Sequence, residues 1–230
     1  MHKEIYDINL GNADHSIRKN ADSDFISFCD KQAKSLSWFK NWENTLDWNP
    51  PFAKWFVGGK INASFNALDV HQNSKSRKTA IFWEGEDGSS REISYSELFT
   101  DVKKFANVLK SLGVKKGDRV TIYLPMVPEL PISMLACARI GAVHSIIFGG
   151  FSPDSIATRI NDCESDYLIT ADEGVRGGKI IPLKKIADEA LLQCPNIKKC
   201  VVVKRTGNQV NWDHERDVSY EEIVSKASAK

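Results

Sequence analysis

Two short segments combine glycines with side chains that bind flat or negatively charged ligands. The first is residues 148–151, with the sequence FGGF, and the second is residues 174–179, with the sequence GVRGGK. Each follows a run of residues typical of a buried strand, and α/β proteins bind ligands at the carboxyl ends of such strands. Glycine adopts positive φ without strain and lets backbone N–H groups approach an anion closely. The second segment therefore has the composition of a phosphate-binding turn.

The charged residues of segment 174–179 fit a phosphate group in particular. Arg176 offers a planar, permanently charged fork that matches two phosphate oxygens, and Lys179 adds a point charge three residues on. Lys184 and Lys185 are close enough in sequence to raise the local positive potential. The pattern predicts a clamp for a terminal phosphate, but short turns with glycine and cations are also typical of solvent-exposed surface. From the spacing alone, both interpretations stay open.

Segment 148–151 has a different chemistry, because a phenylalanine stands on each side of its two glycines. Such a segment offers a flat apolar wall beside a smooth stretch of backbone, which suits an aromatic base or a thin acyl chain. The alternative is a strand-end turn whose two phenylalanines pack in the core. His144, which lies a few residues earlier in an apolar strand, is interpreted as a core histidine with satisfied hydrogen bonds.

No motif for covalent or metal-dependent catalysis occurs in the sequence. It has no Gly-x-Gly-x-x-Gly, no Walker loop ending in Gly-Lys-Ser/Thr, no Gly-x-Ser-x-Gly, no His-Glu-x-x-His and no acidic calcium loop. The 5 histidines are scattered, and the 5 cysteines form no Cys-x-x-Cys. We therefore expect buried reduced thiols and no metal site. The residues nominate no catalytic nucleophile or general base.

From about Thr79 onward, apolar strands alternate with amphipathic helices. Two strands at 80–83 and 91–95 flank an Asp87-Gly88 turn, and Ser94-x-x-Glu97 is a capping box for a helix to about residue 112. Further strands are expected at 119–124, 143–148, 167–170 and 200–204, and further helices at 128–140, 152–163, 183–193 and after Ser219. The alternation predicts an α/β fold with a layered parallel sheet, covered on both faces and joined by right-handed crossovers. Residues 206–217 are predicted to form a polar loop, and the last helix is predicted to have no strand partner.

Residues 1–75 differ from the rest, because four of the 6 tryptophans lie within a short stretch of them. A helix is predicted over about 24–36, followed by an irregular, aromatic-rich segment and a short helix near 64–73. So little regular structure is expected that this part is predicted to pack against a larger body, with its tryptophans in packing contacts rather than stacked on a ligand. The expected organisation is an irregular, mainly helical segment over 1–75 and the first part of a larger domain over 76–230.

The charge balance excludes several classes of partner. The 31 lysines and arginines and the 30 aspartates and glutamates give a net charge of +1, which argues against general nucleic-acid binding or a basic membrane surface. No stretch approaches the ~18–20 apolar residues of a spanning helix, and the N-terminus lacks the apolar region of a signal peptide. We therefore expect a cytoplasmic protein that binds small molecules, and the oligomeric state stays open.

Six stretches taken together carry a family resemblance. They are residues 55–62 (WFVGGKIN), 66–71 (NALDVH), 116–120 (KGDRV), 141–144 (GAVH), 148–152 (FGGFS) and 169–179 (ITADEGVRGGK). These resemble the N-terminal third of AMP-forming acetyl-coenzyme A synthetases, in register from about residue 22 to the C-terminus. The tryptophan-containing stretch is specific to the acetyl and propionyl branch of the adenylate-forming enzymes, whose layered fold the resemblance also implies.

The resemblance implies an enzyme that makes an acyl-adenylate from a short carboxylate and ATP with Mg²⁺, and then transfers the acyl group to coenzyme A. It implies that the ribose 3′-phosphate of coenzyme A lies at the basic turn, and that the adenine lies beside the strand-end segment. The residues so assigned to coenzyme A are Arg176, Gly177, Gly178, Lys179, Phe148, Gly149 and Gly150. The ATP and Mg²⁺ sites and the catalytic groups are expected outside this part, which is expected to be inactive alone.

Two residues depart from the family pattern. Lys179 stands where the family usually has arginine, which keeps the charge but gives up bidentate geometry. Val70 replaces a usual arginine between Asp69 and His71, and thereby puts the packing of that helix in question. The alternative function, should the natural chain end at Lys230, is a free-standing coenzyme A- or nucleotide-binding or regulatory module without catalysis.

Overall fold

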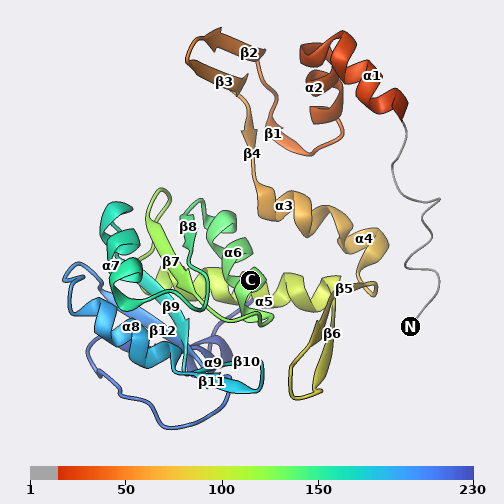
Figure 1. Cartoon of the computed structure of the whole chain (residues 1–230). Coiled ribbons are helices and arrows are strands. Elements are labelled where there is room, and N and C mark those ends of the chain that lie inside the picture. The colour runs from red at the N-terminus through yellow and green to blue at the C-terminus, as the bar shows by residue number, and fades with distance from the viewer. Residues whose placement is uncertain (1–14) are drawn as a thin grey trace. The chain divides into compact units, whose positions relative to one another are not determined.

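The computed structural model describes residues 15–230, which divide into two compact units. The first unit ends at Ile61, and the second is Asn62–Lys230 (Figure 1). The part of the predicted N-terminal segment that precedes residue 15 lies outside the described residues. The domain boundary predicted between residues 75 and 76 stays a prediction, because a division into compact units does not test where one family domain ends and the next begins.

The first unit contains helices and short strands. In chain order these are α1 (His15–Ser23), α2 (Phe25–Ala33), β1 (Trp38–Lys40), β2 (Asn44–Asn49), β3 (Phe52–Val57) and β4 (Lys60–Ile61). The carboxylate of Asp24 accepts the backbone N–H of Ser27 at 3.0 Å and so caps α2. β2 and β3 form an antiparallel hairpin, and β1 pairs with β4. The sequence predicts the capped helix but not the strands, because they are short and their exposed residues do not alternate.

Trp38 and Trp42 pack against each other and contact α2, whereas Trp48 is 64% exposed. The ring of Trp38 lies 4.8 Å from that of Trp42 and 5.4 Å from that of Phe56. The indole N–H of Trp38 donates to the carbonyl of Ala33 at 2.9 Å. Among residues 16–61, only Ala33 is buried, so the aromatic cluster remains partly exposed. These contacts agree with the predicted packing role of Trp38 and Trp42.

The second unit opens with short helices that polar contacts hold onto α6. Their bounds are α3 (Ala63–Ala67), η3 (Asp69–His71) and α4 (Gln72–Lys75), and α6 is Glu129–Ile140. The side-chain amide of Asn62 donates to the carbonyls of Ala138 and Arg139 at 3.0 and 3.1 Å. Arg139 also binds both carboxylate oxygens of Asp69, at 2.7 and 2.9 Å. Val70 is 38% exposed, and none of these hydrogen bonds involves its side chain. They are therefore present although Val70 departs from the family pattern.

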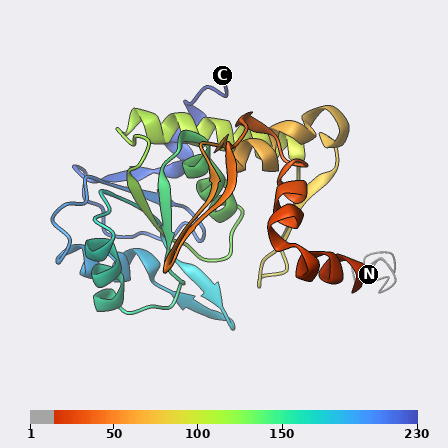
Figure 2. The same cartoon turned by 90° about the horizontal axis from the view of Figure 1, so that it is seen from above.

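A parallel five-stranded sheet forms the centre of the second unit, in the order β13-β12-β9-β7-β8. Its strands are β7 (Arg119–Tyr123), β8 (Val143–Ile146), β9 (Tyr167–Ala171), β12 (Lys199–Val203) and β13 (Asp217–Ser219). Helices cover both faces, with α5, α6 and α9 on one and α7 and α8 on the other (Figures 1 and 2). These further helices are α5 (Tyr95–Ser111), α7 (Pro153–Asp162), α8 (Leu183–Leu191) and α9 (Tyr220–Ser225). The predicted layered α/β fold is confirmed.

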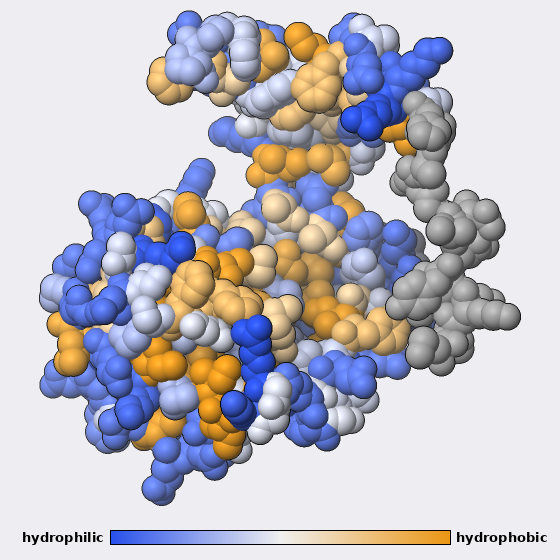
Figure 3. All heavy atoms as spheres, in the orientation of Figure 1, coloured by the Kyte–Doolittle hydropathy of each residue, from blue (hydrophilic) through white to orange (hydrophobic). Residues whose placement is uncertain are grey.

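The strands differ in how deeply they are buried. All five residues of β9 are buried, as expected for a strand in the middle of a covered sheet. β8 is an edge strand, and Val143 and Ile146 at its two ends are exposed. The prediction that the strands are covered on both faces is therefore wrong for the two ends of β8. Figure 3 shows hydrophobic residues on the surface of this unit among hydrophilic ones.

The sheet also contains a strand that the sequence does not predict. β13 pairs in parallel with β12, with Asp217 opposite Cys200, and it leads directly into α9. The hydroxyl of Ser219 accepts the backbone N–H of Glu222 at 3.4 Å and caps α9 as expected. The prediction that this helix lacks a strand partner is therefore wrong. The sequence does not reveal β13, because a strand of three residues gives too short a pattern to recognise.

Before α5, β5 (Thr79–Glu84) and β6 (Ser90–Ser94) form the predicted antiparallel hairpin around Gly88. Ser94 then begins α5 with a reciprocal capping box. Its hydroxyl accepts the backbone N–H of Glu97 at 3.3 Å, and the carboxylate of Glu97 accepts the backbone N–H of Ser94 at 2.8 Å. Both predictions from the sequence are confirmed.

We expect Ser94→Ala to lower the free energy of unfolding of the chain by about 1 kcal/mol, because it removes one half of this capping box. Urea denaturation measures the effect. Ser111→Ala at the opposite end of α5 is the matched control, with an expected change within about 0.5 kcal/mol. Equal stability of wild type and Ser94→Ala would contradict the prediction.

Candidate functional site

The basic segment 174–179 forms the tip of a second β-hairpin. β10 (Gly174–Arg176) and β11 (Lys179–Ile181) pair antiparallel, and Gly177 and Gly178 form the turn between them. Both glycines have positive φ, +57° and +70°, the combination that a two-residue hairpin turn requires. No other part of the described chain lies within 4 Å of a Cβ built at either glycine, so the tip is open. The predicted glycine turn is thus present, in a hairpin that the sequence analysis does not recognise.

Two cations stand opposite each other at this tip. Arg176 and Lys179 are direct cross-strand partners, so their side chains leave the same face of the hairpin. Both are exposed, and within residues 15–230 neither forms an ion pair. Like charges directly opposite each other destabilise a hairpin. An anion bound between them would remove that repulsion.

The strand-end segment lies next to the basic hairpin. Phe148 follows β8, its side chain is 55% exposed, and the guanidinium of Arg176 lies over its ring at 5.1 Å. A Cβ at Gly150 would lie 3.8 Å from a guanidinium nitrogen of Arg176, and a Cβ at Gly149 would lie 3.4 Å from the carbonyl oxygen of Leu124. The fold therefore brings the two predicted segments together, although 24 residues separate the glycines at 150 and 174 in sequence (174 − 150).

Both segments border one cleft of about 480 Å³. Its wall also includes residues that the sequence analysis does not assign, namely Trp83, Met126, Leu130 and Arg205. Met126 comes shortly after β7 and Arg205 shortly after β12, so the ends of β7, β8, β9 and β12 all contribute to the wall. Since ligands bind at the carboxyl ends of parallel strands, the position of Arg205 shortly after a run of valines is a signal in the sequence that points to this edge of the sheet.

An acidic turn borders the same cleft. It belongs to the β5–β6 hairpin, and the carboxylate of Glu86 accepts the backbone N–H of Gly178 at 3.1 Å. The next residue, Asp87, forms an ion pair of 3.3 Å with Arg205. Hydrogen bonds from the hydroxyl and the backbone N–H of Ser89 are the main cause that lowers the pKa of Asp87 to about 2. Asp87 is therefore ionised at neutral pH.

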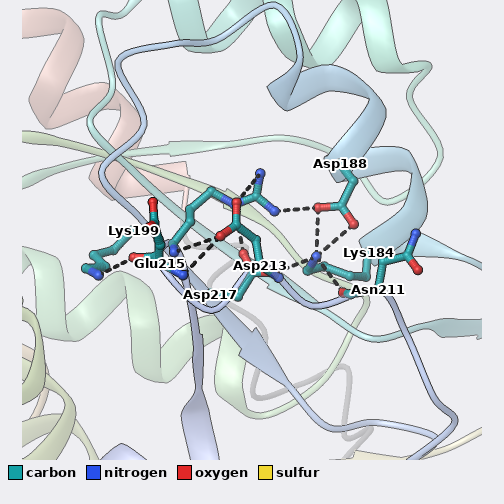
Figure 4. Close-up of polar contacts among 8 residues, drawn as sticks. Lys184, Asp188, Lys199, Asn211, Asp213, Glu215 and Asp217 are labelled. Atoms are coloured by element: carbon teal, nitrogen blue, oxygen red, sulfur yellow. Dashed lines mark hydrogen bonds and ion pairs between the residues drawn. The ribbon is translucent and has the colours of Figure 1, made fainter.

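Lys184 does not raise the positive potential at the hairpin as predicted. Its side chain is fully buried, and its Nζ lies 2.7 Å from Asp188 and 2.8 Å from Asp217. The ammonium also donates to the carbonyl of Asn211 at 3.0 Å (Figure 4). The prediction is wrong because two carboxylates neutralise this charge. Lys185, by contrast, is exposed.

Arg216 completes this buried network. It binds Asp188 at 2.7 Å through Nη2 and Asp217 at 2.8 Å through Nε. Burial raises the pKa of Asp217, but hydrogen bonds from Arg216 and Lys184 outweigh burial, and the pKa lies below its usual value. The network joins the start of α8, which directly follows the basic hairpin, to β13 at the edge of the sheet. It is a structural element and not part of the cleft.

The cysteines and His144, which could also do chemistry, do not line the cleft. Burial raises the pKa of both Cys137 and Cys200 to about 12, and the five cysteines are free. The predicted burial holds for Cys137, Cys194 and Cys200 but is wrong for Cys29 and Cys163, which are only partly buried. His144 is half-buried, and its Nδ1 has no hydrogen-bond partner in the described chain. The prediction of a satisfied histidine is therefore wrong for that buried atom. Across residues 15–230, no three His, Cys, Asp or Glu side chains are gathered in a way that could hold a metal ion.

We expect Lys184→Met to lower the free energy of unfolding by about 3–5 kcal/mol, because it removes a buried ammonium and leaves Asp188 and Asp217 to share the charge of Arg216. Lys185→Met removes an exposed charge from the next position and should change stability by no more than about 0.5 kcal/mol. Urea denaturation of both variants measures the difference. Similar free energies of unfolding for the two variants would show that the network does not stabilise the fold.

Comparisons with known proteins cover nearly the whole of the described chain. The sequence model of the family described as AMP-binding enzyme matches residues 68–228, and that of the acetyl-coenzyme A synthetase N-terminus matches residues 15–67. The acetyl-coenzyme A synthetase of Rubrobacter xylanophilus is 55% identical over 216 residues, which are 93% of this chain and 34% of the relative. That of Syntrophus aciditrophicus is 50% identical over 212 residues, which are 90% of this chain and 33% of the relative. The chain thus spans about a third of the length of these relatives.

A solved structure supports the fold independently. The acetoacetyl-CoA synthetase from Streptomyces lividans superposes with a TM-score of 0.83 at 24% sequence identity, over 90% of this chain and 32% of that one. At this identity the likeness establishes the layered fold alone. Together with the two family matches, it confirms the resemblance stated from the sequence. The chain belongs to the family of AMP-binding enzymes and corresponds to an N-terminal portion of its acetyl-coenzyme A synthetase members.

Proposed function

We propose that this chain is part of an AMP-forming acetate–CoA ligase and supplies binding residues for coenzyme A. The intact protein would convert acetate, or a similar short carboxylate, and ATP to an acyl-adenylate and transfer the acyl group to coenzyme A. The observation that carries the proposal is the pair of cations, Arg176 and Lys179, opposed at an open hairpin tip beside an exposed phenylalanine. Relatives at 50–55% identity named acetyl-coenzyme A synthetase support the activity.

The hairpin tip suits the ribose 3′-phosphate of coenzyme A. Arg176 offers a fork for two phosphate oxygens, and the N–H of Gly177 lies at the same tip, whereas that of Gly178 donates to Glu86. Lys179 adds charge from the opposite strand without bidentate geometry. Binding a phosphate here would replace repulsion between two cations by attraction of both to one anion.

The strand-end segment suits the adenine of coenzyme A. Phe148 presents an exposed ring, and Gly149 and Gly150 leave the adjacent backbone without side chains. An adenine stacked in this position would lie within the cleft and beside Arg176, whose guanidinium already lies against the ring of Phe148. One nucleotide would then contact both predicted segments.

ATP and Mg²⁺ are part of the proposed reaction but have no assigned residues here. Mg²⁺ would neutralise charge on the phosphates of ATP. In the part of the chain that the structure describes, no three His, Cys, Asp or Glu side chains are gathered to hold a metal ion, and the expectation that the ATP and Mg²⁺ sites lie elsewhere stays a prediction. None of its helices is both long and apolar enough to cross a membrane. The cytoplasmic location predicted from the sequence stays a prediction.

We expect Arg176→Ala to weaken coenzyme A binding to the intact protein by about 1–3 kcal/mol, the cost of losing a charged hydrogen-bond donor. Affinity for 3′-dephospho-coenzyme A should stay unchanged, because that ligand lacks the phosphate in question. Isothermal titration calorimetry measures both. Lys185→Ala, at an exposed cation outside the hairpin, is the matched control and should affect neither ligand. Equal losses for both ligands in Arg176→Ala would contradict the assignment.

We also expect the 230-residue chain alone to show no acetate-dependent release of pyrophosphate from ATP, while the intact ligase that contains it shows this activity. A pyrophosphate-coupled assay on both proteins measures the difference. Activity of the chain alone would refute the proposal that the ATP site lies elsewhere. Coenzyme A binding without activity in any longer form would instead favour a binding module.

A further inference from the structure

A second arginine on an aromatic ring borders the cleft. The guanidinium of Arg205 lies over the ring of Trp83 at 5.2 Å, as that of Arg176 lies over Phe148 at 5.1 Å. The two arginines come from segments that follow different strands of the sheet, β12 and β9, yet both form part of the wall of the same cleft. The cleft therefore has two separate cationic positions, each backed by a flat ring.

The backbone at Arg205 is held firmly by a buried carboxylate. Asp172, directly after β9, accepts the backbone N–H groups of Arg205 at 2.8 Å and Gly207 at 2.7 Å. It also accepts that of Thr206 at 3.2 Å. The side chain of Arg205 is only 17% exposed, and the indole N–H of Trp83 is fixed to the carbonyl of Met126 at 2.7 Å. A cation fixed in this way loses little conformational entropy when it binds a ligand.

Arg205 already binds one oxyanion, the carboxylate of Asp87, so a second oxyanion could occupy the same position. Its guanidinium pairs with a carboxylate oxygen of Asp87 at 3.3 Å, a long contact for a charged pair. Asp87 is itself half-exposed and bonded to Ser89, whose contacts are the main cause of its lowered pKa. Arg205 can therefore exchange this carboxylate for a phosphate oxygen without leaving Asp87 buried and unpaired.

We propose that Arg205 binds the diphosphate of coenzyme A while Arg176 binds the ribose 3′-phosphate of the same molecule. The inference rests on the proposed function, because it assumes that coenzyme A occupies this cleft. A ligand with two anionic groups on one nucleotide fits a cleft with two cationic positions. Trp83 and Phe148 then support the two guanidinium groups from behind, and Asp87 releases Arg205 when the diphosphate enters.

The test compares coenzyme A with 3′-dephospho-coenzyme A in the intact protein by calorimetry. Arg205→Ala should weaken both ligands by the same factor, about tenfold to a hundredfold, because both carry the diphosphate. Arg205→Gln, which keeps the first three carbons of the side chain and replaces the guanidinium by a neutral amide, should give the same equal loss. This variant serves if Arg205→Ala fails to fold. Arg176→Ala should weaken coenzyme A alone.

Asp87→Asn is the matched control, since it removes the ion pair but keeps Arg205. It should leave both affinities unchanged or slightly tighter. If Asp87→Asn weakens binding as much as Arg205→Ala, Arg205 acts only as a structural tie and the inference is wrong. Unchanged affinities in Arg205→Ala also overturn it. If Arg205→Ala weakens both ligands but Arg176→Ala weakens neither, the 3′-phosphate assignment fails while the assignment of Arg205 stands.

Discussion

Electrostatic repulsion between two side chains on a two-residue turn is the constraint on which the candidate site depends. Arg176 and Lys179 are cross-strand partners because Gly177 and Gly178 both adopt positive φ, and a longer or differently shaped turn would separate the charges. A hairpin gains nothing from like charges placed opposite each other. An anion bound between Arg176 and Lys179 would offset this repulsion and would explain why the two cations lie opposite each other. The acidic turn nearby supplies one carboxylate, Glu86, to the backbone of this tip and none to its two cations.

The parallel sheet explains why residues far apart in sequence meet at this tip. β7, β8, β9 and β12 run in the same direction, so the loops that follow them lie along one edge of the sheet. Two buried carboxylates then fix these loops. Asp172 binds the backbone after β12, and its own carbonyl accepts the N–H of Lys184 at 3.0 Å. Asp217 binds the side chain of the same lysine. The hairpin between β9 and α8 is thus anchored at both of its ends.

The sequence predicts the layered fold and the two glycine-rich segments because each depends on local signals, such as the capping box at Ser94 and the glycines at 177 and 178. It does not predict what depends on contacts between distant segments. Lys184 follows the basic turn closely, yet it is buried between carboxylates that lie 4 and 33 residues further on (188 − 184 and 217 − 184). Only the fold reveals that its charge is unavailable. Arg205 shortly follows a run of valines, which marks the end of a strand, but only the fold shows that it shares a cleft with Arg176.

The most direct test of the account is the structure of the intact protein with coenzyme A bound. The account predicts the 3′-phosphate within hydrogen-bonding distance of the guanidinium of Arg176, with the adenine against Phe148. A coenzyme A molecule whose 3′-phosphate lies elsewhere, with Arg176 and Lys179 facing only solvent, would contradict it.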